Sequence, residues 1–70
     1  MAEVRSNMAG TVFQLLVSVG DQVNAGDDVV VLESMKMEVP IASEFSGVVK
    51  ELRVEVGTFV NEDDVLLVLE

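Results

Sequence analysis

Apolar and polar residues alternate with a period of two along most of this chain. Leu15, Val17 and Val19 fall on one side of an extended segment, and Leu16 and Ser18 fall on the other. The same alternation returns 37 residues further on, and valine supplies many of the apolar positions, as is usual in strands. No stretch has a helical period. The pattern predicts an all-β protein.

The chain is also a duplicated segment. Residues 1–33 and 38–70 align at a constant offset of 37, and 13 of the 33 aligned pairs are identical. Two copies are too few for a solenoid, so we expect one domain over 1–70, with a single core around a pseudo-two-fold axis. Residues 34–37 have no partner in the alignment and should lie on that axis. The two termini should then lie close together at the opposite end.

Each copy is expected to hold four short strands. Turn residues bound them at roughly 2–5, 11–19 (bent or bulged midway), 22–23 and 28–33, with equivalents 37 residues later. Two such sets must bury their apolar faces on each other. The predicted fold is a flattened, quasi-two-fold β-barrel or sandwich of two four-stranded antiparallel sheets, with the copies interleaved.

Alignment of the copies also predicts exposed positions. Phe13 aligns with Lys50, and Leu16 aligns with Arg53. A position that accepts a cation in one copy should lie on the surface in both. The sequence leaves open whether Phe13 and Leu16 form a partner-facing patch or are ordinary exposed apolar residues.

The composition excludes several classes of function. The chain has no cysteine and no histidine, so disulfides, thiol chemistry, the usual general base and the commonest metal ligand are missing. The acidic segments 27–28 and 62–64 lack the ligand spacing of a calcium loop, and we expect no metal site. No catalytic constellation is visible, so the chain is not expected to be an enzyme by itself.

The net charge of −9 argues against nucleic acid and anionic membranes as partners. The longest apolar run, Val65–Leu69, is too short to span a bilayer, and no signal peptide is visible, so we expect a cytoplasmic location. The acidic excess either prevents strands from pairing edge to edge or recruits a basic partner. Charge alone does not separate these two explanations.

Residues 34–37, Ser-Met-Lys-Met, must form a tight hairpin. Such hairpins favour glycine, asparagine or aspartate where φ is positive, and the segment has none of them. A turn that departs from the local rule indicates function. Lys36, one of only two lysines, is therefore the candidate site. Met35 and Met37 either cover the end of the barrel or offer contact area to partners.

The segment Glu33–Glu38 (ESMKME), followed by Val39–Ile41, closely resembles the attachment signature of the biotinyl/lipoyl carrier domains. The resemblance covers essentially the whole chain, including the family's glycine positions. It implies a flattened quasi-symmetric β-barrel and a prosthetic group in amide linkage on Lys36. Two departures stand out: Asn7 replaces a frequent proline, and no insertion interrupts 13–19. The second departure puts membership of the acetyl-CoA carboxylase branch in doubt.

Methionine on both sides of the lysine is typical of the biotinyl form, whereas lipoyl domains usually have aspartate and alanine there. Met35 and Met37 are thus expected to contribute to recognition of the turn. Glu33 occupies an acidic position shared by both branches. Glu33 and Glu38 flank the turn and could stabilise the Lys36 ammonium, with little effect if exposed.

The resemblance implies a non-catalytic biotin carrier that a biotin protein ligase modifies on Lys36. The partners would be the biotin carboxylase and carboxyltransferase components of a biotin-dependent carboxylase. One alternative is a lipoyl carrier of an oxo-acid dehydrogenase-type complex, or an acceptor of both groups. Another is an unmodified scaffold or adaptor.

Overall fold

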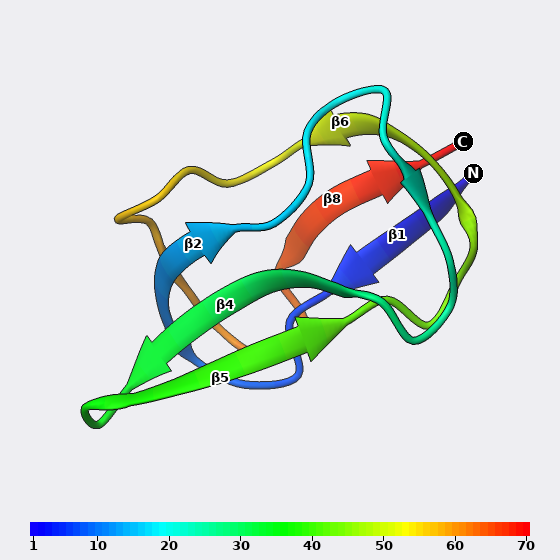
Figure 1. The fold of residues 1–70 in the computed structure, drawn as a ribbon. Helices are drawn as coiled ribbons and strands as arrows, with labels where there is room; N and C mark the ends of the chain where they lie inside the picture. The colour runs from blue at the N-terminus through cyan, green and yellow to red at the C-terminus, as the bar shows by residue number, and fades with distance from the viewer.

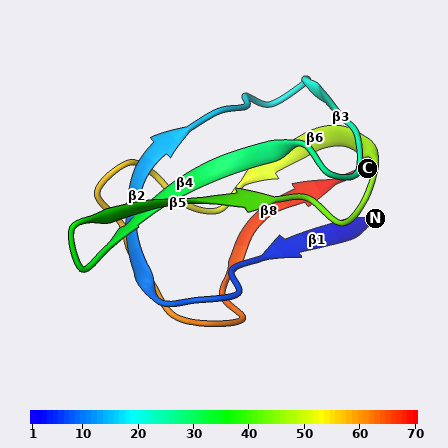
Figure 2. The same ribbon diagram turned by 60° about the horizontal axis from the view of Figure 1, so that its bottom comes forward.

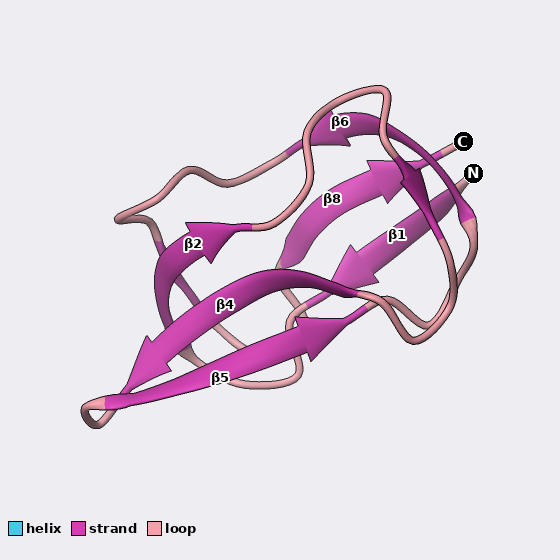
Figure 3. Ribbon diagram, viewed as in Figure 1, coloured by secondary structure: helices cyan, strands magenta, loops and turns pink.

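The computed structural model describes all residues, 1–70, and every regular element in it is a strand (Figure 3). The strands are β1 (Ala2–Arg5), β2 (Gly10–Leu15), β3 (Gln22–Val23), β4 (Asp28–Ser34), β5 (Met37–Ala42), β6 (Gly47–Leu52), β7 (Phe59–Val60) and β8 (Val65–Leu69). The molecule contains no helix able to cross a membrane.

The strands form two four-stranded sheets with the orders β1-β8-β6-β3 and β5-β4-β2-β7, and all paired strands are antiparallel (Figure 1). The sheets enclose the core of a body measuring 32 × 19 × 18 Å. This arrangement confirms the predicted all-β fold. The predicted bulge in the long strand is present as a register shift between Val12 and Gln14.

The two copies are interleaved. Adding 37 to the residue numbers converts β1 into β5, β2 into β6, β3 into β7 and β4 into β8, so one sheet order maps onto the other. Hydrogen bonds repeat in the same way: the Ser6 amide donates to the carbonyl of Asp64, and the Ser43 amide donates to that of Asp27, both at 2.9 Å. Each sheet therefore contains strands from both copies.

The termini lie side by side, as the duplication predicts. β1 and β8 pair with Ala2 opposite Leu69, and Figures 1 and 2 show both chain ends at the end of the molecule away from the β4–β5 turn. The β4–β5 hairpin projects from the other end.

Every strand contributes to the core. The buried cluster consists of Val4, Val12, Val23, Val29, Val30, Leu32, Ile41, Val49, Val54, Val60, Leu66, Leu67 and Leu69. The buried polar side chains are those of Ser6 and Ser43, and no buried side-chain nitrogen or oxygen lacks a hydrogen-bond partner. A tightly packed interior of this kind holds the hairpin on a rigid base.

The strands predicted over 11–19 and its equivalent are shorter than expected, because β2 ends at Leu15 and β6 at Leu52. Val19 is 60% exposed instead of continuing the inner face. The cause is a turn in which the Ser18 amide donates to the Asp21 carboxylate at 2.8 Å and Gly20 takes a φ of 96°. This turn takes the chain out of the sheet before the alternation can continue.

Candidate functional site

The turn between β4 and β5 contains two residues in the left-handed region. Ser34 pairs with Met37, and between them Met35 has φ 52° and Lys36 has φ 66°. Two successive positive φ values are the mark of a type I′ hairpin turn. An L-residue in this conformation costs roughly 1–2 kcal/mol. The turn is therefore built from residues that its backbone does not favour.

The register of the hairpin is set by its inner face. Leu32 is fully buried and lies opposite Val39, while the next pair outward, Glu33 and Glu38, faces solvent. A slip of one residue would move Leu32 to the solvent face, so the core fixes which residues occupy the tip. Packing against β2 thus places Lys36 at the end of the projecting hairpin (Figure 1).

The side chains at the tip are accessible. Met35 is 93% and Met37 64% exposed, and Lys36 is exposed as well. The two methionines are too exposed to cover the end of the barrel, and the contact with partners expected of them stays a prediction.

Lys36 forms no ion pair. The two ion pairs in the molecule are Arg5–Glu3 and Arg53–Glu51, both outside the hairpin. The carboxylates of Glu33 and Glu38 lie more than 4 Å from the lysine amine, so the stabilising contact considered for them is absent. The amine is free for a reaction with an incoming reagent.

The chemistry of the tip is that of a presented nucleophile. No group of three or more aspartate, glutamate, histidine or cysteine side chains is placed to hold a metal ion. A long, unpaired amine at the end of a rigid hairpin fits a covalently attached group, which needs an accessible atom and no enclosing pocket. The residues present therefore fit a prosthetic group joined through an amide.

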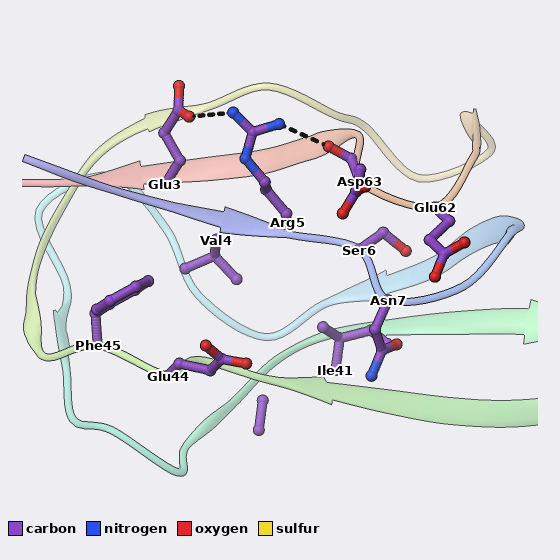
Figure 4. A pocket seen from close by; sticks show the side chains of 11 residues that line it. Glu3, Val4, Arg5, Ser6, Asn7, Ile41, Glu44, Phe45, Glu62 and Asp63 are labelled. Carbon is purple, nitrogen blue, oxygen red and sulfur yellow. Dashed lines mark hydrogen bonds and ion pairs between the residues drawn. The ribbon is translucent and has the colours of Figure 1, made fainter.

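The hollow shown in Figure 4 lies elsewhere. It has a volume of about 400 Å³ and lies beside β1 and the end of β5, with Val4 and Ile41 at its floor. Arg5 crosses its rim, pairing with Glu3 and donating to the Asp63 carbonyl at 2.9 Å. None of the residues that line it belongs to the lysine turn.

One exposed residue near the site escaped the sequence analysis. Phe59 pairs with Thr11, which pairs with Glu33, so Phe59 lies on the outer face of the sheet that carries the hairpin. It is 61% exposed. Its alignment with Gln22 was the signal that could have marked it.

A family model described as "Biotin-requiring enzyme" matches residues 2–69 of this chain. Biotinylated protein TB7.3 of Mycobacterium tuberculosis is 52% identical over 42 residues, which are 59% of this chain and 59% of that protein. The biotin/lipoyl attachment protein of Bacillus subtilis is 52% identical over 41 residues, covering 59% of this chain and 56% of its own length. The aligned region thus spans somewhat more than half of these relatives.

Three further matches are to a carboxyltransferase subunit and to two carboxylases. The 1.3S subunit of methylmalonyl-CoA carboxyltransferase of Propionibacterium freudenreichii is 56% identical over 36 residues, or 51% of this chain and 29% of the subunit. The crystal structure of Kluyveromyces lactis urea carboxylase superposes with a TM-score of 0.90 at 30% identity, covering 99% of this chain and 6% of that one. A single-chain, multi-domain long-chain acyl-CoA carboxylase gives a TM-score of 0.85 at 33% identity, covering 94% of this chain and 6% of that one.

Proposed function

The chain belongs to the biotinyl/lipoyl carrier-domain family, and from this membership we propose that it is a non-catalytic biotin carrier, biotinylated on Lys36 by a biotin protein ligase. The observation that carries the proposal is the position of Lys36: a lysine in the left-handed region, at the tip of a two-residue turn, with no ion pair. A turn selected for stability alone would use asparagine and glycine there. The methionines on both sides support biotin over lipoate.

In the modification reaction, this chain would present the Lys36 amine to the ligase. A lysine amine is an ammonium at neutral pH, so the ligase must remove a proton before the nitrogen attacks an activated acyl group. The amide bond forms as the activating group leaves. Because the hairpin projects from the barrel, the amine can enter the ligase without unfolding of the strands that carry it (Figure 1).

After modification, the domain would act as a tether. Biotin supplies a ureido nitrogen that can carry a carboxyl group. The hairpin holds that group away from the barrel and raises its local concentration at each active site in turn. Met35 and Met37, as flexible apolar side chains, offer adaptable contact to more than one partner.

We propose that these partners are the biotin carboxylase and carboxyltransferase components of a biotin-dependent carboxylase. Relatives and structural neighbours named as a carboxyltransferase subunit and as carboxylases support this assignment. The carrier would move carboxylate between the two active sites, and the partners would supply the catalysis.

The test is the intact mass of the chain purified from its own host, with peptide mapping across the turn. We expect an increase of one biotinyl group on Lys36. The variant Lys36→Arg should show no increase, whereas the matched control Lys50→Arg should be modified fully. A lipoyl or octanoyl increment would replace the assignment with acyl transfer, and an unmodified wild-type chain would favour the scaffold alternative.

A further inference from the structure

The pseudo-symmetry provides an internal comparison between the two sheets. Positions related by the offset of 37 have the same backbone surroundings, so the fold makes similar demands on both. A residue that is apolar and exposed in one sheet but polar in the other is therefore not required by the fold. Such positions indicate a function, such as binding, that belongs to one sheet and not to the other.

The outer face of the sheet β5-β4-β2-β7 differs from its equivalent in this way. We call it the aromatic face, and its members are Phe13, Leu16, Val31, Pro40 and Phe59. Their equivalents in the other sheet are Lys50, Arg53, Val68, Glu3 and Gln22. Four of the five positions change from apolar to polar or charged.

The two aromatic residues of this face come from neighbouring strands, Phe13 from β2 and Phe59 from β7. Thr11 lies opposite Phe59, and beyond this pair the Val12 amide donates to the Thr58 carbonyl while the Val12 carbonyl accepts from the Gly57 amide. Phe13 lies two residues beyond Thr11 in β2, on the strand next to the one that carries Phe59. Phe13 is 46% exposed and Phe59 61% exposed.

The aromatic face is next to the lysine turn. The row that begins at Phe59 and Thr11 continues through Glu33 to Glu38. Glu33 and Glu38 are one residue from the pair that closes the turn. A protein that receives the Lys36 side chain approaches this end of the molecule and meets the face.

Charge is divided between the sheets as well. The strands of β5-β4-β2-β7 carry three carboxylates, those of Asp28, Glu33 and Glu38, and no lysine or arginine. The strands of the other sheet carry two carboxylates and two cations. The two cations are Arg5, which forms an ion pair with Glu3, and Lys50. The strands of one sheet thus carry only negative charge, whereas positive and negative charges balance in the strands of the other.

We infer that the aromatic face docks a protein whose active-site entrance combines an apolar patch with a rim of lysine or arginine. The occupant that fits is the enzyme component that loads the carboxyl group, so the inference rests on the proposed function. That enzyme binds anionic substrates, and clefts that do so are lined with positive charge. The aromatic pair fills the apolar patch, and the acidic row of Glu33 and Glu38 matches the rim.

The experiment measures the carboxylation of biotinylated chain by a purified biotin carboxylase component, using radiolabelled bicarbonate. The test variant is Phe13→Lys with Phe59→Gln, which installs the residues that the other sheet already tolerates at these positions. The matched control is Lys50→Phe with Gln22→Phe, which adds the same rings to the opposite face. All proteins are biotinylated beforehand, and their masses and melting temperatures are compared with wild type.

Removal of the two rings should raise KM for the carrier roughly tenfold with little change in kcat. The control pair should leave KM unchanged. Added salt should raise the wild-type KM, and Glu33→Gln with Glu38→Gln should weaken that dependence. A higher KM after removal of the two rings, together with a weaker salt dependence after removal of the two carboxylates, identifies the aromatic face as the docking surface.

Equal KM values for the test variant and wild type would overturn the inference. So would a test variant that the ligase modifies slowly but the carboxylase accepts normally, because the face would then serve the ligase. Failure of the proposed function itself is recognised separately: wild-type chain would lack a biotinyl group by mass before any carboxylation is measured.

Discussion

Lys36 combines a functional side chain with an unfavourable backbone. Its φ of 66° is one that glycine adopts freely and lysine does not, and the residue makes no ion pair in return. Nothing in the hairpin therefore compensates locally for the conformation. The stability of the barrel supports it, as is common where a functional residue overrides the preference of the backbone.

Replacement of Lys36 by glycine should consequently stabilise the protein while abolishing modification. The gain in free energy of unfolding should be about 0.5–1 kcal/mol, because the relief of left-handed strain exceeds the added entropy of an unfolded glycine. Urea unfolding followed by far-UV circular dichroism measures it, since the chain has no tryptophan or tyrosine.

The reverse substitution is the control for this prediction. Gly57 has a φ of 97° in an open turn, and Gly57→Lys should lower the free energy of unfolding by about 1 kcal/mol or more. If Lys36→Gly instead destabilised the protein, the side chain of Lys36 would be contributing contacts that the structure does not show.

Among the elements, the central pair β2–β4 depends on a close approach. A Cβ added at Gly10 would lie 2.9 Å from the carbonyl oxygen of Glu33, and one added at the equivalent Gly47 would lie 2.7 Å from that of Glu70. Both contacts are with backbone, which cannot rotate away. Glycine at these two positions lets each sheet bring its neighbouring strands together.

Gly10→Ala should lower the free energy of unfolding by about 1–2 kcal/mol, since displacement of the backbone outweighs the reduced entropy of the unfolded chain. Because Glu33 precedes Ser34 directly, the change should also loosen the turn and speed hydrogen exchange of the Met37 amide. Gly47→Ala should destabilise by a similar amount without affecting Met37. Equal exchange in both variants would contradict the link between Gly10 and the turn.

Sequence reasoning succeeded for elements whose pattern is local and failed where the outcome depends on pairing. The β4–β5 hairpin and the strain in its turn were predictable from alternation and from the absence of asparagine and glycine. The end of β2 was not predictable from the sequence. The apolar–polar alternation continues beyond it, but a hydrogen bond from the Ser18 amide to the Asp21 carboxylate turns the chain out of the sheet. Phe59 was missed since its place in the row with Thr11 and Glu33 follows from the register between strands.

The molecule as a whole is held together by repeated details. Ser6 is 1% exposed and its hydroxyl donates to the Met8 carbonyl at 2.5 Å, while Ser43 is 2% exposed and donates to the Phe45 carbonyl at 2.6 Å. The Ser6 hydroxyl also accepts from the Met8 amide, and the Ser43 hydroxyl accepts from the Phe45 amide. The two serines therefore close equivalent corners of the barrel.

Ser6→Ala and Ser43→Ala should each lower the free energy of unfolding by about 1–2 kcal/mol, because each leaves a backbone carbonyl and amide without partners. Urea unfolding of both variants under one condition measures the losses. Similar values would show that the pseudo-symmetry extends to energetics. A large effect at only one site would show that a single corner dominates.

The strands of the sheet that carries the hairpin hold three carboxylates and no lysine or arginine. A basic surface attracts these carboxylates before the two proteins touch, which favours encounters in which the hairpin faces the opposing protein. Encounters would then begin with Lys36 already near the opposing protein. Charge would in this way orient the small domain before contact, and short-range packing would then determine how long the complex lasts.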